Sequence, residues 1–248
     1  MKPLLEKTLI FAHRGARAYL PDNTLEAFEL AHKMGAEGVE LDVRFSADGA
    51  VVVCHETKLD GMTEATGPVA ERTLAELKAL DVGCGFYHGE KKGFRMPTLD
   101  EVYDLVAPWD MIVNVEIKAA DPAIVAACDK IAVRHGMRDK IIYSSFNHYQ
   151  IKRVQDEIPG AFIAPLYTWN LLNPWNYCVD IGAPAVHPLF EVIKVTEDYV
   201  KKCHEKGVRV HPWTVNGEDD IRYLLEQGVD VIMTDYPDIG VRLRDEMK

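Results

Sequence analysis

The sequence lacks the features of a disulfide scaffold, a membrane protein or a nucleic-acid-binding protein. Its five cysteines are scattered, and none forms a Cys-x-x-Cys pair, which predicts free thiols in a reducing compartment. No apolar run reaches the roughly 20 residues of a membrane-spanning helix. Lys and Arg number 28 against 39 Asp and Glu, a formal charge of -11, which argues against non-specific binding to nucleic acid or to an anionic membrane.

Two further signals are missing. Glu6 and Lys7 interrupt the N-terminal stretch where a secretory signal peptide needs unbroken apolar residues, so we expect a cytoplasmic protein. No Gly-x-Gly-x-x-Gly follows the first predicted strand, which weakens a dinucleotide-binding interpretation. The length of 248 residues is enough for a full core, and we expect residues 1–248 to form a single domain.

What is present is a regular alternation of short β-rich runs with amphipathic stretches. The β-rich runs are LIFAH (9–13), GVELDVRF (38–45), VVVCH (51–55), MIVNVEIK (111–118), KIIYSS (140–145), AFIAPLY (161–167), PAVHP (184–188), VRVHPWTV (208–215) and VDVIMTD (229–235). Asp48-Gly49 predicts a two-residue hairpin, so the third run should lie antiparallel to the second. The remaining eight runs in βα order predict an α/β fold, a (β/α)8 TIM barrel, with a doubly wound open sheet as the alternative.

Local signals add three helix starts and one insertion. Capping boxes are predicted for Asn23 with Glu26, Thr73 with Glu76 and Thr98 with Glu101. Residues 56–97 are rich in turns and hold one short predicted helix. We expect this segment to be an insertion packed over one end of the barrel, where such segments often shape a substrate site.

Polar residues interrupt the apolar runs where strands of a barrel should end. They are His13, Arg14, Glu40, Asp42, Glu116, Lys118, Trp213 and Asn216. Active sites of (β/α)8 barrels form at the carboxyl ends of the strands, and residues two apart on a strand share a face. The pair Glu40 and Asp42, and the pair Glu116 and Lys118, should therefore each point into the barrel. On an open sheet they would simply face solvent.

The chemistry of these side chains points to an anionic substrate and a cation. Three carboxylates, those of Glu40, Asp42 and Glu116, favour Mg²⁺, Ca²⁺ or Mn²⁺ over zinc. The cationic Arg14 and Lys118 suit phosphate oxygens.

Two histidines complete this set. His13 and His55 can divide the acid and base roles. A two-residue hairpin would place Asp42 opposite His55, whereas a bulge would shift the pairing by one residue. Together these groups are typical of a site for phosphoryl transfer on an anionic substrate.

The chain resembles the glycerophosphodiester phosphodiesterases, metal-dependent (β/α)8 enzymes. The resemblance runs from about residue 8 to 240 and depends on the order and spacing of its motifs. They are HRG (13–15), PDNT (21–24), ELDV (40–43), DGAVVVCHE (48–56), MPTLDEV (96–102), EIK (116–118), WTVN (213–216) and TDYP (234–237). Asp22 and Glu56 depart from the family, which commonly has Glu and Asp there.

The resemblance implies hydrolysis of a glycerophosphodiester to glycerol 3-phosphate and an alcohol. It implies that Glu40, Asp42 and Glu116 hold one divalent cation, that His13 and His55 are the general acid and base, and that Arg14 and Lys118 bind phosphate. Trp213 is either a packing residue or an apolar wall against the glycerol carbons.

Two rival functions stay open. One is a lysophospholipase D-like enzyme acting on lysolipids, and the other is a barrel that binds phosphodiesters without catalysis. The aromatic loop YTWNLLNPWNY (167–177) could cover the barrel mouth, contact a second subunit of a homo-oligomer, or contact a lipid-like alcohol. We favour the first two, because the acidic chain shows no basic membrane patch.

Overall fold

The computed structural model describes residues 7–247; Glu6, which contributed to the signal-peptide argument, lies outside them. The strands are β1 (Leu9–His13), β2 (Gly38–Phe45), β3 (Val51–Val53), β4 (Ile112–Ile117), β5 (Ile141–Ser145), β6 (Phe162–Tyr167), β7 (Ala185–Pro188), β8 (Arg209–Val210) and β9 (Val231–Thr234). The α-helices are α1 (Leu25–Lys33), α2 (Leu74–Ala79), α3 (Leu99–Val106), α4 (Ala123–Arg134), α5 (His148–Glu157), α6 (Pro174–Asp180), α7 (Phe190–Val195), α8 (Tyr199–Glu205), α9 (Glu218–Glu226) and α10 (Pro237–Glu246). Three 3-10 turns are η1 (Val69–Glu71), η2 (Ala107–Trp109) and η3 (Arg138–Lys140).

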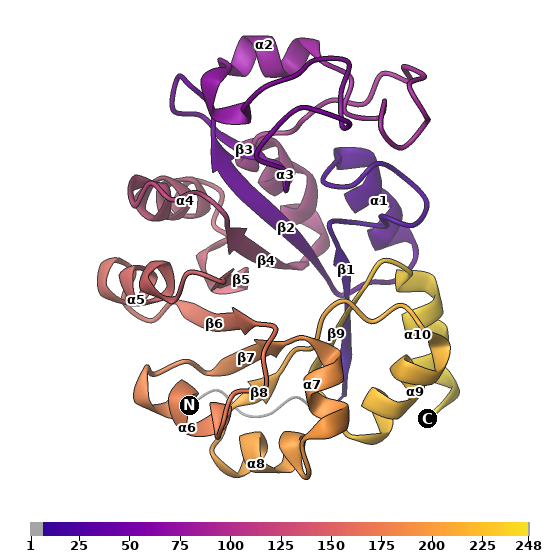
Figure 1. Cartoon of the computed structure of the whole chain (residues 1–248), viewed down its shortest axis with the longest axis vertical. Helices are drawn as coiled ribbons and strands as arrows, with labels where there is room; N and C mark the ends of the chain where they lie inside the picture. The colour runs from indigo at the N-terminus through magenta and orange to yellow at the C-terminus, as the bar shows by residue number, and fades with distance from the viewer. Residues whose placement is uncertain (1–6, 248) are drawn as a thin grey trace.

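The strands form a barrel of parallel strands surrounded by helices (Figure 1). Neighbouring strands follow the order β8-β7-β6-β5-β4-β2-β1-β9. Backbone bonds from Asp230 N to Val210 O (3.0 Å) and from Val215 N to Met233 O (2.9 Å) bring β8 and β9 together. The predicted (β/α)8 barrel is confirmed, and the open sheet is excluded.

The eighth barrel strand is much shorter than the predicted run 208–215. Only Arg209–Val210 is regular strand. Pro212 has no backbone N–H to continue the ladder, and Trp213 makes only an isolated bridge to Leu189. This irregular end leaves Trp213 near the mouth of the barrel.

The apolar residues pack in two layers, as a barrel requires. One layer fills the space between strands and helices, and a smaller one fills the barrel interior with Phe11, Ile142, Phe162 and Met233. The polar residues of the predicted site lie above this inner layer, where the strands end. No helix within residues 7–247 is both long enough and apolar enough to cross a membrane.

The hairpin between β2 and β3 differs from the prediction by one residue. Val43 pairs with Val53, and Ser46 N donates to Ala50 O (2.9 Å), so the loop holds three residues. Its last residue, Gly49, has a φ of 81°, a conformation typical of a bulged hairpin loop. The predicted pairing of Asp42 with His55 is therefore wrong: Cys54 N donates to the backbone oxygen of Asp42.

Helix caps were predicted correctly in two of three places. Thr73 and Thr98 both form capping boxes with the glutamate three residues later. The predicted box at Asn23 is wrong, because the cap of α1 is Thr24 and Asn23 has a positive φ of 56°. Because Asn23 does not cap α1, its side chain is available to the candidate active site.

Residues 56–97 form the predicted insertion. Figure 1 shows the segment around α2 beyond the ends of β2 and β3, outside the ring of helices. It holds η1 as well as α2, and its own apolar cluster includes Leu59, Leu77 and Met96. Val52 and Cys54 of the hairpin belong to the same cluster, so the insertion is packed directly on β3.

Candidate active site

The segment after β1 is shaped by two residues in left-handed conformations. Arg14 has a φ of 55° and Gly15 a φ of 82°. A Cβ on Gly15 would lie 2.7 Å from the Cβ of Ala27 on α1, so only glycine fits. This tight turn aims the Arg14 N–H at Glu40 Oε2 (3.0 Å) and folds the arginine side chain over β2.

Three carboxylates meet at the carboxyl ends of β2 and β4. Glu40, Asp42 and Glu116 are all buried, and each offers an oxygen within 4.8 Å of the others. The strands place them there because Asp42 pairs with Glu116 in the parallel ladder, and Glu40 shares the inward face of β2. These three side chains lie together, as the sequence predicts.

Two cationic side chains, those of Arg14 and Lys118, neutralise part of the negative charge of the carboxylates. Arg14 Nε lies 3.4 Å from Asp42 Oδ2, and Lys118 Nζ lies 2.6 Å from Glu116 Oε1 and 3.6 Å from Asp42 Oδ1. Although burial opposes ionisation, Arg14 and Lys118 hold the pKa of Asp42 below its usual value. Asp42 is therefore the carboxylate that stays ionised.

The other two carboxyl groups do not ionise easily. Burial, together with the charge of Asp42, raises the pKa of Glu116 to about 7 and raises that of Glu40 well above its usual value. Two buried oxygens, Asp42 Oδ1 and Glu116 Oε1, find no hydrogen-bond partner among the described residues, although Glu116 Oε1 lies against Lys118. Three buried carboxyl groups that repel one another, two of them with an oxygen that lacks a hydrogen bond from the described part of the chain, fit a divalent cation.

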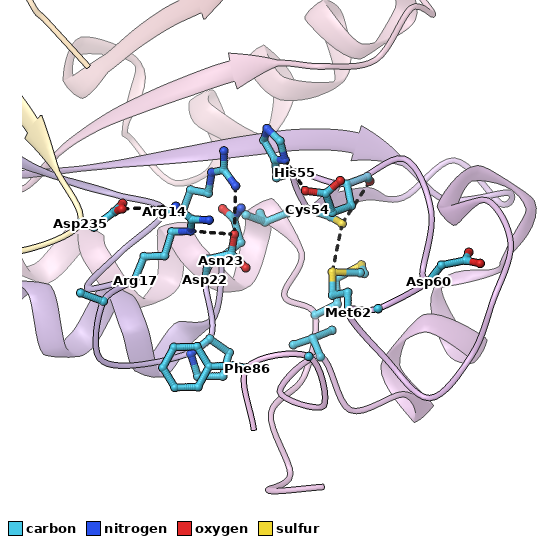
Figure 2. Close-up of a pocket in the computed structure, with 18 of the residues that line it drawn as sticks. Arg14, Arg17, Asp22, Asn23, Cys54, His55, Asp60, Met62, Phe86 and Asp235 are labelled. Atoms are coloured by element: carbon cyan, nitrogen blue, oxygen red, sulfur yellow. Dashed lines mark hydrogen bonds and ion pairs between the residues drawn. The ribbon is translucent and has the colours of Figure 1, made fainter. Parts of the chain in front are cut away.

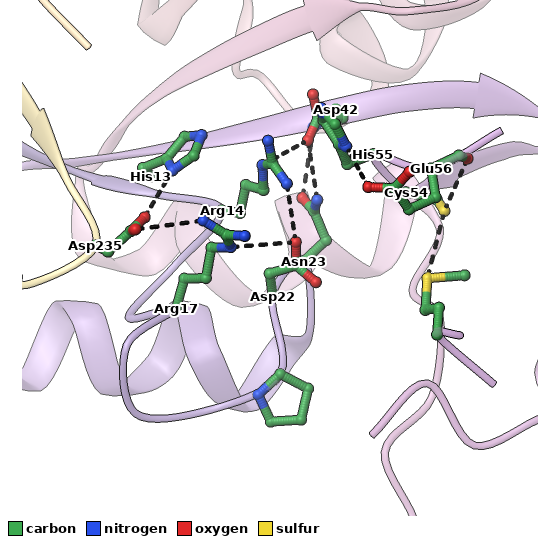
Figure 3. Close-up of polar contacts among 12 residues, drawn as sticks. His13, Arg14, Arg17, Asp22, Asn23, Asp42, Cys54, His55, Glu56 and Asp235 are labelled. Atoms are coloured by element: carbon green, nitrogen blue, oxygen red, sulfur yellow. Dashed lines mark hydrogen bonds and ion pairs between the residues drawn. The ribbon is translucent and has the colours of Figure 1, made fainter. Parts of the chain in front are cut away.

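His13 is held by a partner from the far end of the chain. Its Nδ1 lies 2.7 Å from Asp235 Oδ1, and its Nε2 lies 4.0 Å from Glu40 Oε2. Burial lowers the pKa of His13, against the opposing effect of Asp235. The other oxygen of Asp235 accepts from Asn216 Nδ2 (2.8 Å) and from Arg17 Nη1 (3.3 Å), so the carboxylate that orients His13 is itself fixed. Figure 3 shows Asp235 between His13 and Arg17.

His55 reaches the site from the turn after β3. Arg44 donates to the backbone oxygen of His55, and His55 Nδ1 lies 2.7 Å from Glu56 Oε1. Burial lowers the pKa of His55, while the charge of Asp42 opposes this effect. Although the predicted pairing register was wrong, the charge of Asp42 therefore still affects the pKa of His55.

Sequence reasoning missed Asn23 and Asp235. Asn23 Nδ2 donates to Asp42 Oδ2 (3.0 Å), and Asp22 accepts from Arg14 Nη1 (3.2 Å). Because β1 and β9 are neighbours, with Ala12 beside Thr234, Asp235 follows directly at the side of His13. Asp235 could have been predicted from the closure of the barrel, because closure makes the last strand a neighbour of the first.

Trp213 does not join the polar cluster directly. Its Nε1 donates to the backbone oxygen of His187 (2.9 Å), and its ring packs edge-on against Phe146. The Phe146 ring lies 5.5 Å from Lys118 Nζ. Trp213 thus lies in the wall of the mouth on the Lys118 side.

Two further histidines and the aromatic loop 167–177 have surroundings other than the carboxylate group. His187 and His211 form a buried pair, Nε2 to Nδ1 at 3.0 Å. In the loop 167–177, Trp169 and Leu172 are 77% and 94% exposed, so the loop does not bury its apolar tip against the barrel mouth.

A cavity of about 550 Å³ adjoins the carboxylate cluster. Arg14, Asn23, His55 and Asp235 line its inner side, and the insertion forms its outer side (Figure 2). The fold and the site together define a barrel hydrolase for phosphoryl groups: buried oxygen donors for a cation, two cationic side chains and two histidines gather at one mouth of the barrel, and Arg14 and His55 reach the cavity beside it.

The comparisons with known proteins name the family. The sequence model of the glycerophosphoryl diester phosphodiesterase family matches residues 13–239, and the chain belongs to this family. It is 38% identical to the glycerophosphodiester phosphodiesterase of Caldanaerobacter subterraneus over 96% of this chain and 98% of that protein. The predicted enzyme class, a glycerophosphodiester phosphodiesterase, is thereby confirmed.

Solved structures agree. The glycerophosphodiester phosphodiesterase of Agrobacterium tumefaciens superposes with a TM-score of 0.82 at 29% identity, covering 95% of this chain and 99% of that one. A phosphodiesterase of Oleispira antarctica in complex with the product sn-glycerol-3-phosphate gives a TM-score of 0.88 at 26% identity, covering 96% and 97%.

Proposed function

We propose that this chain hydrolyses small glycerophosphodiesters to glycerol 3-phosphate and an alcohol, with a divalent cation held by Glu40, Asp42 and Glu116. The observation that carries the proposal is the buried group of three carboxylates, which is contacted by Arg14 and Lys118 and adjoins an open cavity. The complex of the Oleispira relative with sn-glycerol-3-phosphate supports the same product here.

The cation, when bound, would polarise the phosphoryl oxygens and stabilise the charge that develops on them. Arg14 and Lys118 would bind and orient the phosphate, since guanidinium and ammonium groups suit its oxygens. Trp213 would give the mouth an apolar wall for the glycerol carbons.

His13 and His55 would move the protons. In the overall reaction the phosphorus–oxygen bond to the alcohol breaks and a bond to a water oxygen forms. One histidine accepts the proton that the water loses, and the other donates a proton to the departing alkoxide. Burial lowers the pKa of both histidines, which supports the neutral form that the proton-accepting histidine needs; the other histidine would have to be protonated before it donates.

Release of glycerol 3-phosphate tests this proposal directly. Purified chain is incubated with glycerophosphocholine or glycerophosphoethanolamine after EDTA treatment, and then with added Mg²⁺, Ca²⁺ or Mn²⁺. We expect EDTA to abolish release and a cation to restore it. Release only from a lysolipid would favour the lysophospholipase D-like alternative, and no release with any cation would favour a barrel that only binds.

We also propose a cytoplasmic enzyme of one domain. All five cysteines are free and buried, which supports a reducing compartment. The shared apolar cluster of Val52, Cys54 and the insertion supports one folding unit that includes the insertion. A homo-oligomer through the loop 167–177 is a further proposal, supported by the exposed Trp169 and Leu172.

A further inference from the structure

Arg17 joins two carboxylates that serve different parts of the candidate active site. Its Nε lies 3.6 Å from Asp22 Oδ2, and its Nη1 donates to Asp235 Oδ2 (3.3 Å). Figure 3 shows the Arg17 side chain between these two carboxylates. Arg17 lies between the motifs HRG (13–15) and PDNT (21–24) and belongs to neither, and the proposed reaction gives it no role.

The first carboxylate, that of Asp22, contacts the arginine that would bind phosphate. Asp22 Oδ2 accepts from Arg14 Nη1 (3.2 Å), so this one oxygen lies against two guanidinium groups. The backbone N–H of Asn23 donates to Arg14 O (2.9 Å), which holds the two chain segments together. On its other side Arg14 Nε lies 3.4 Å from Asp42 Oδ2. Asp22 is therefore the outer anchor of Arg14, and Arg17 fixes that anchor.

The second carboxylate, that of Asp235, contacts the histidine that would transfer protons. Asp235 Oδ1 lies 2.7 Å from His13 Nδ1, and Oδ2 accepts from both Asn216 and Arg17. Burial would raise the pKa of Asp235, but His13, Asn216 and Arg17 hold it below its usual value. The Asp235 side chain is only 12% exposed. An ionised carboxylate this buried needs a cationic partner while His13 is neutral, and Arg17 is such a partner.

The position of Arg17 suits a bridge between the two carboxylates. Its N–H donates to Gly15 O (2.8 Å), and the next residue, Ala18, donates its N–H to Asp235 O (3.2 Å). The backbone is thus fixed on both sides of the arginine. A planar guanidinium presents its N–H groups in a rigid fork, so one side chain can hold Asp22 and Asp235 at a constant spacing.

We propose that Arg17 is a positioning residue, an inference that rests on the proposed phosphodiesterase function and adds a residue to it. Through Asp22 it holds Arg14 in the orientation that binds phosphate. Through Asp235 it holds His13 in the orientation that transfers protons. Each effect passes through one carboxylate, so loss of Arg17 weakens phosphate binding and slows turnover as two separable effects.

The variant Arg17→Met tests this role, because it removes the guanidinium and keeps a stem of similar length. Calorimetry with sn-glycerol 3-phosphate measures phosphate affinity, and release from glycerophosphoethanolamine measures kcat, both with the cation that supports the fastest release. From the strength of partly exposed ion pairs, we expect affinity and kcat each to fall by about two- to tenfold. The control Arg153→Met removes an exposed arginine that donates to Glu157 on α5 and should change neither.

Double-mutant cycles show whether Arg17 acts through the carboxylates. In the Asp22→Asn background, Arg17→Met should cause no further loss of phosphate affinity but should still lower kcat. In the Asp235→Asn background, it should cause no further loss of kcat but should still lower affinity. A general loss of packing would not divide in this way. If Arg17→Met weakens affinity equally with and without Asp22→Asn, Arg17 contacts the phosphate itself, and the positioning role is wrong.

The outcomes separate this inference from the proposed function. If the unmodified chain is active and Arg17→Met leaves both affinity and kcat unchanged, the phosphodiesterase function stands and the positioning role is refuted. If the unmodified chain releases no glycerol 3-phosphate with Mg²⁺, Ca²⁺ or Mn²⁺, the function is refuted, and the role of Arg17 in it falls as well.

Discussion

Asp235 is expected to control catalysis without touching the substrate. Its Oδ1 lies 2.7 Å from His13 Nδ1, and both side chains are largely buried. Arg17 and Asn216 donate to Oδ2, and Asn216 Oδ1 accepts from the backbone N–H of Asp235. A carboxylate fixed in this way keeps the proton of neutral His13 on Nδ1 and leaves Nε2 free for proton transfer.

The change Asp235→Asn measures this effect. Loss of a charge-assisted hydrogen bond costs about 1.5–3 kcal/mol, and each 1.36 kcal/mol is tenfold in rate, so loss of orientation alone predicts a fall of about ten- to a hundredfold in kcat. If the new amide turns its NH2 toward Nδ1, the tautomer inverts, and the corresponding change in a serine-protease triad costs about 10⁴-fold. We therefore expect kcat to fall by about 10–10⁴-fold.

Glycerol 3-phosphate release gives kcat, and calorimetry of cation binding gives the control. Because Asp235 contacts none of the three carboxylates directly, cation affinity should change little. Asp238→Asn, which alters an exposed partner of Tyr19 in the same segment, should keep the activity of the unmodified chain. A kcat for Asp235→Asn within about threefold of the unmodified value would refute the orientation of His13 as a catalytic requirement.

Three other changes probe the cation site, the second histidine and the fold. Glu116→Gln should weaken cation affinity at least tenfold by calorimetry, since the site loses a charged ligand; an unchanged affinity would remove Glu116 from the ligand set. His55→Ala should lower kcat by about 10²–10⁴-fold with cation affinity largely kept, and near-normal turnover would exclude it as acid or base. Glu37→Gln should destabilise the fold by about 1–2 kcal/mol at pH 7 in urea unfolding. Against the effect of burial, the Ile10 N–H and Arg244 lower the pKa of Glu37, so this stability is present above the unfolded pKa and is lost as pH falls through the folded pKa. The two proteins should therefore converge in stability in acid, and a gap that persists there would contradict the assignment.

The sequence was sufficient for the barrel because local patterns and chain order agree. Each β-rich run became a strand, and the ladder pairs Asp42 with Glu116, as the inward faces of neighbouring strands demand. Side chains two apart on a strand share one face, and in a closed barrel that face points either inward or outward. The carboxylate group could therefore be predicted without any knowledge of loops.

Loops were predicted less well because tertiary contacts decide them. Asn23 has the right identity for a helix cap, yet Thr24 takes that role while Asn23 bonds to Asp42. Asp48-Gly49 has the composition of a two-residue hairpin, yet Asp48 Oδ1 accepts from Ser46 Oγ and from the N–H of Leu74 on the insertion. Those contacts are consistent with a three-residue loop, and no local rule contains them.

The insertion adjoins the candidate active site through His55. His55 lies between the end of β3 at Val53 and the start of the insertion at residue 56, and Arg44 of β2 donates to its backbone oxygen. The hairpin thus supplies a rigid base for His55, while the chain that follows supplies Met62 and Phe86 to the cavity wall. The apolar cluster of the insertion includes Cys54 of the hairpin, and Cys54 N donates to the backbone oxygen of Asp42. The position of the carboxylates and the shape of the cavity wall therefore depend on the same packing contacts of the hairpin.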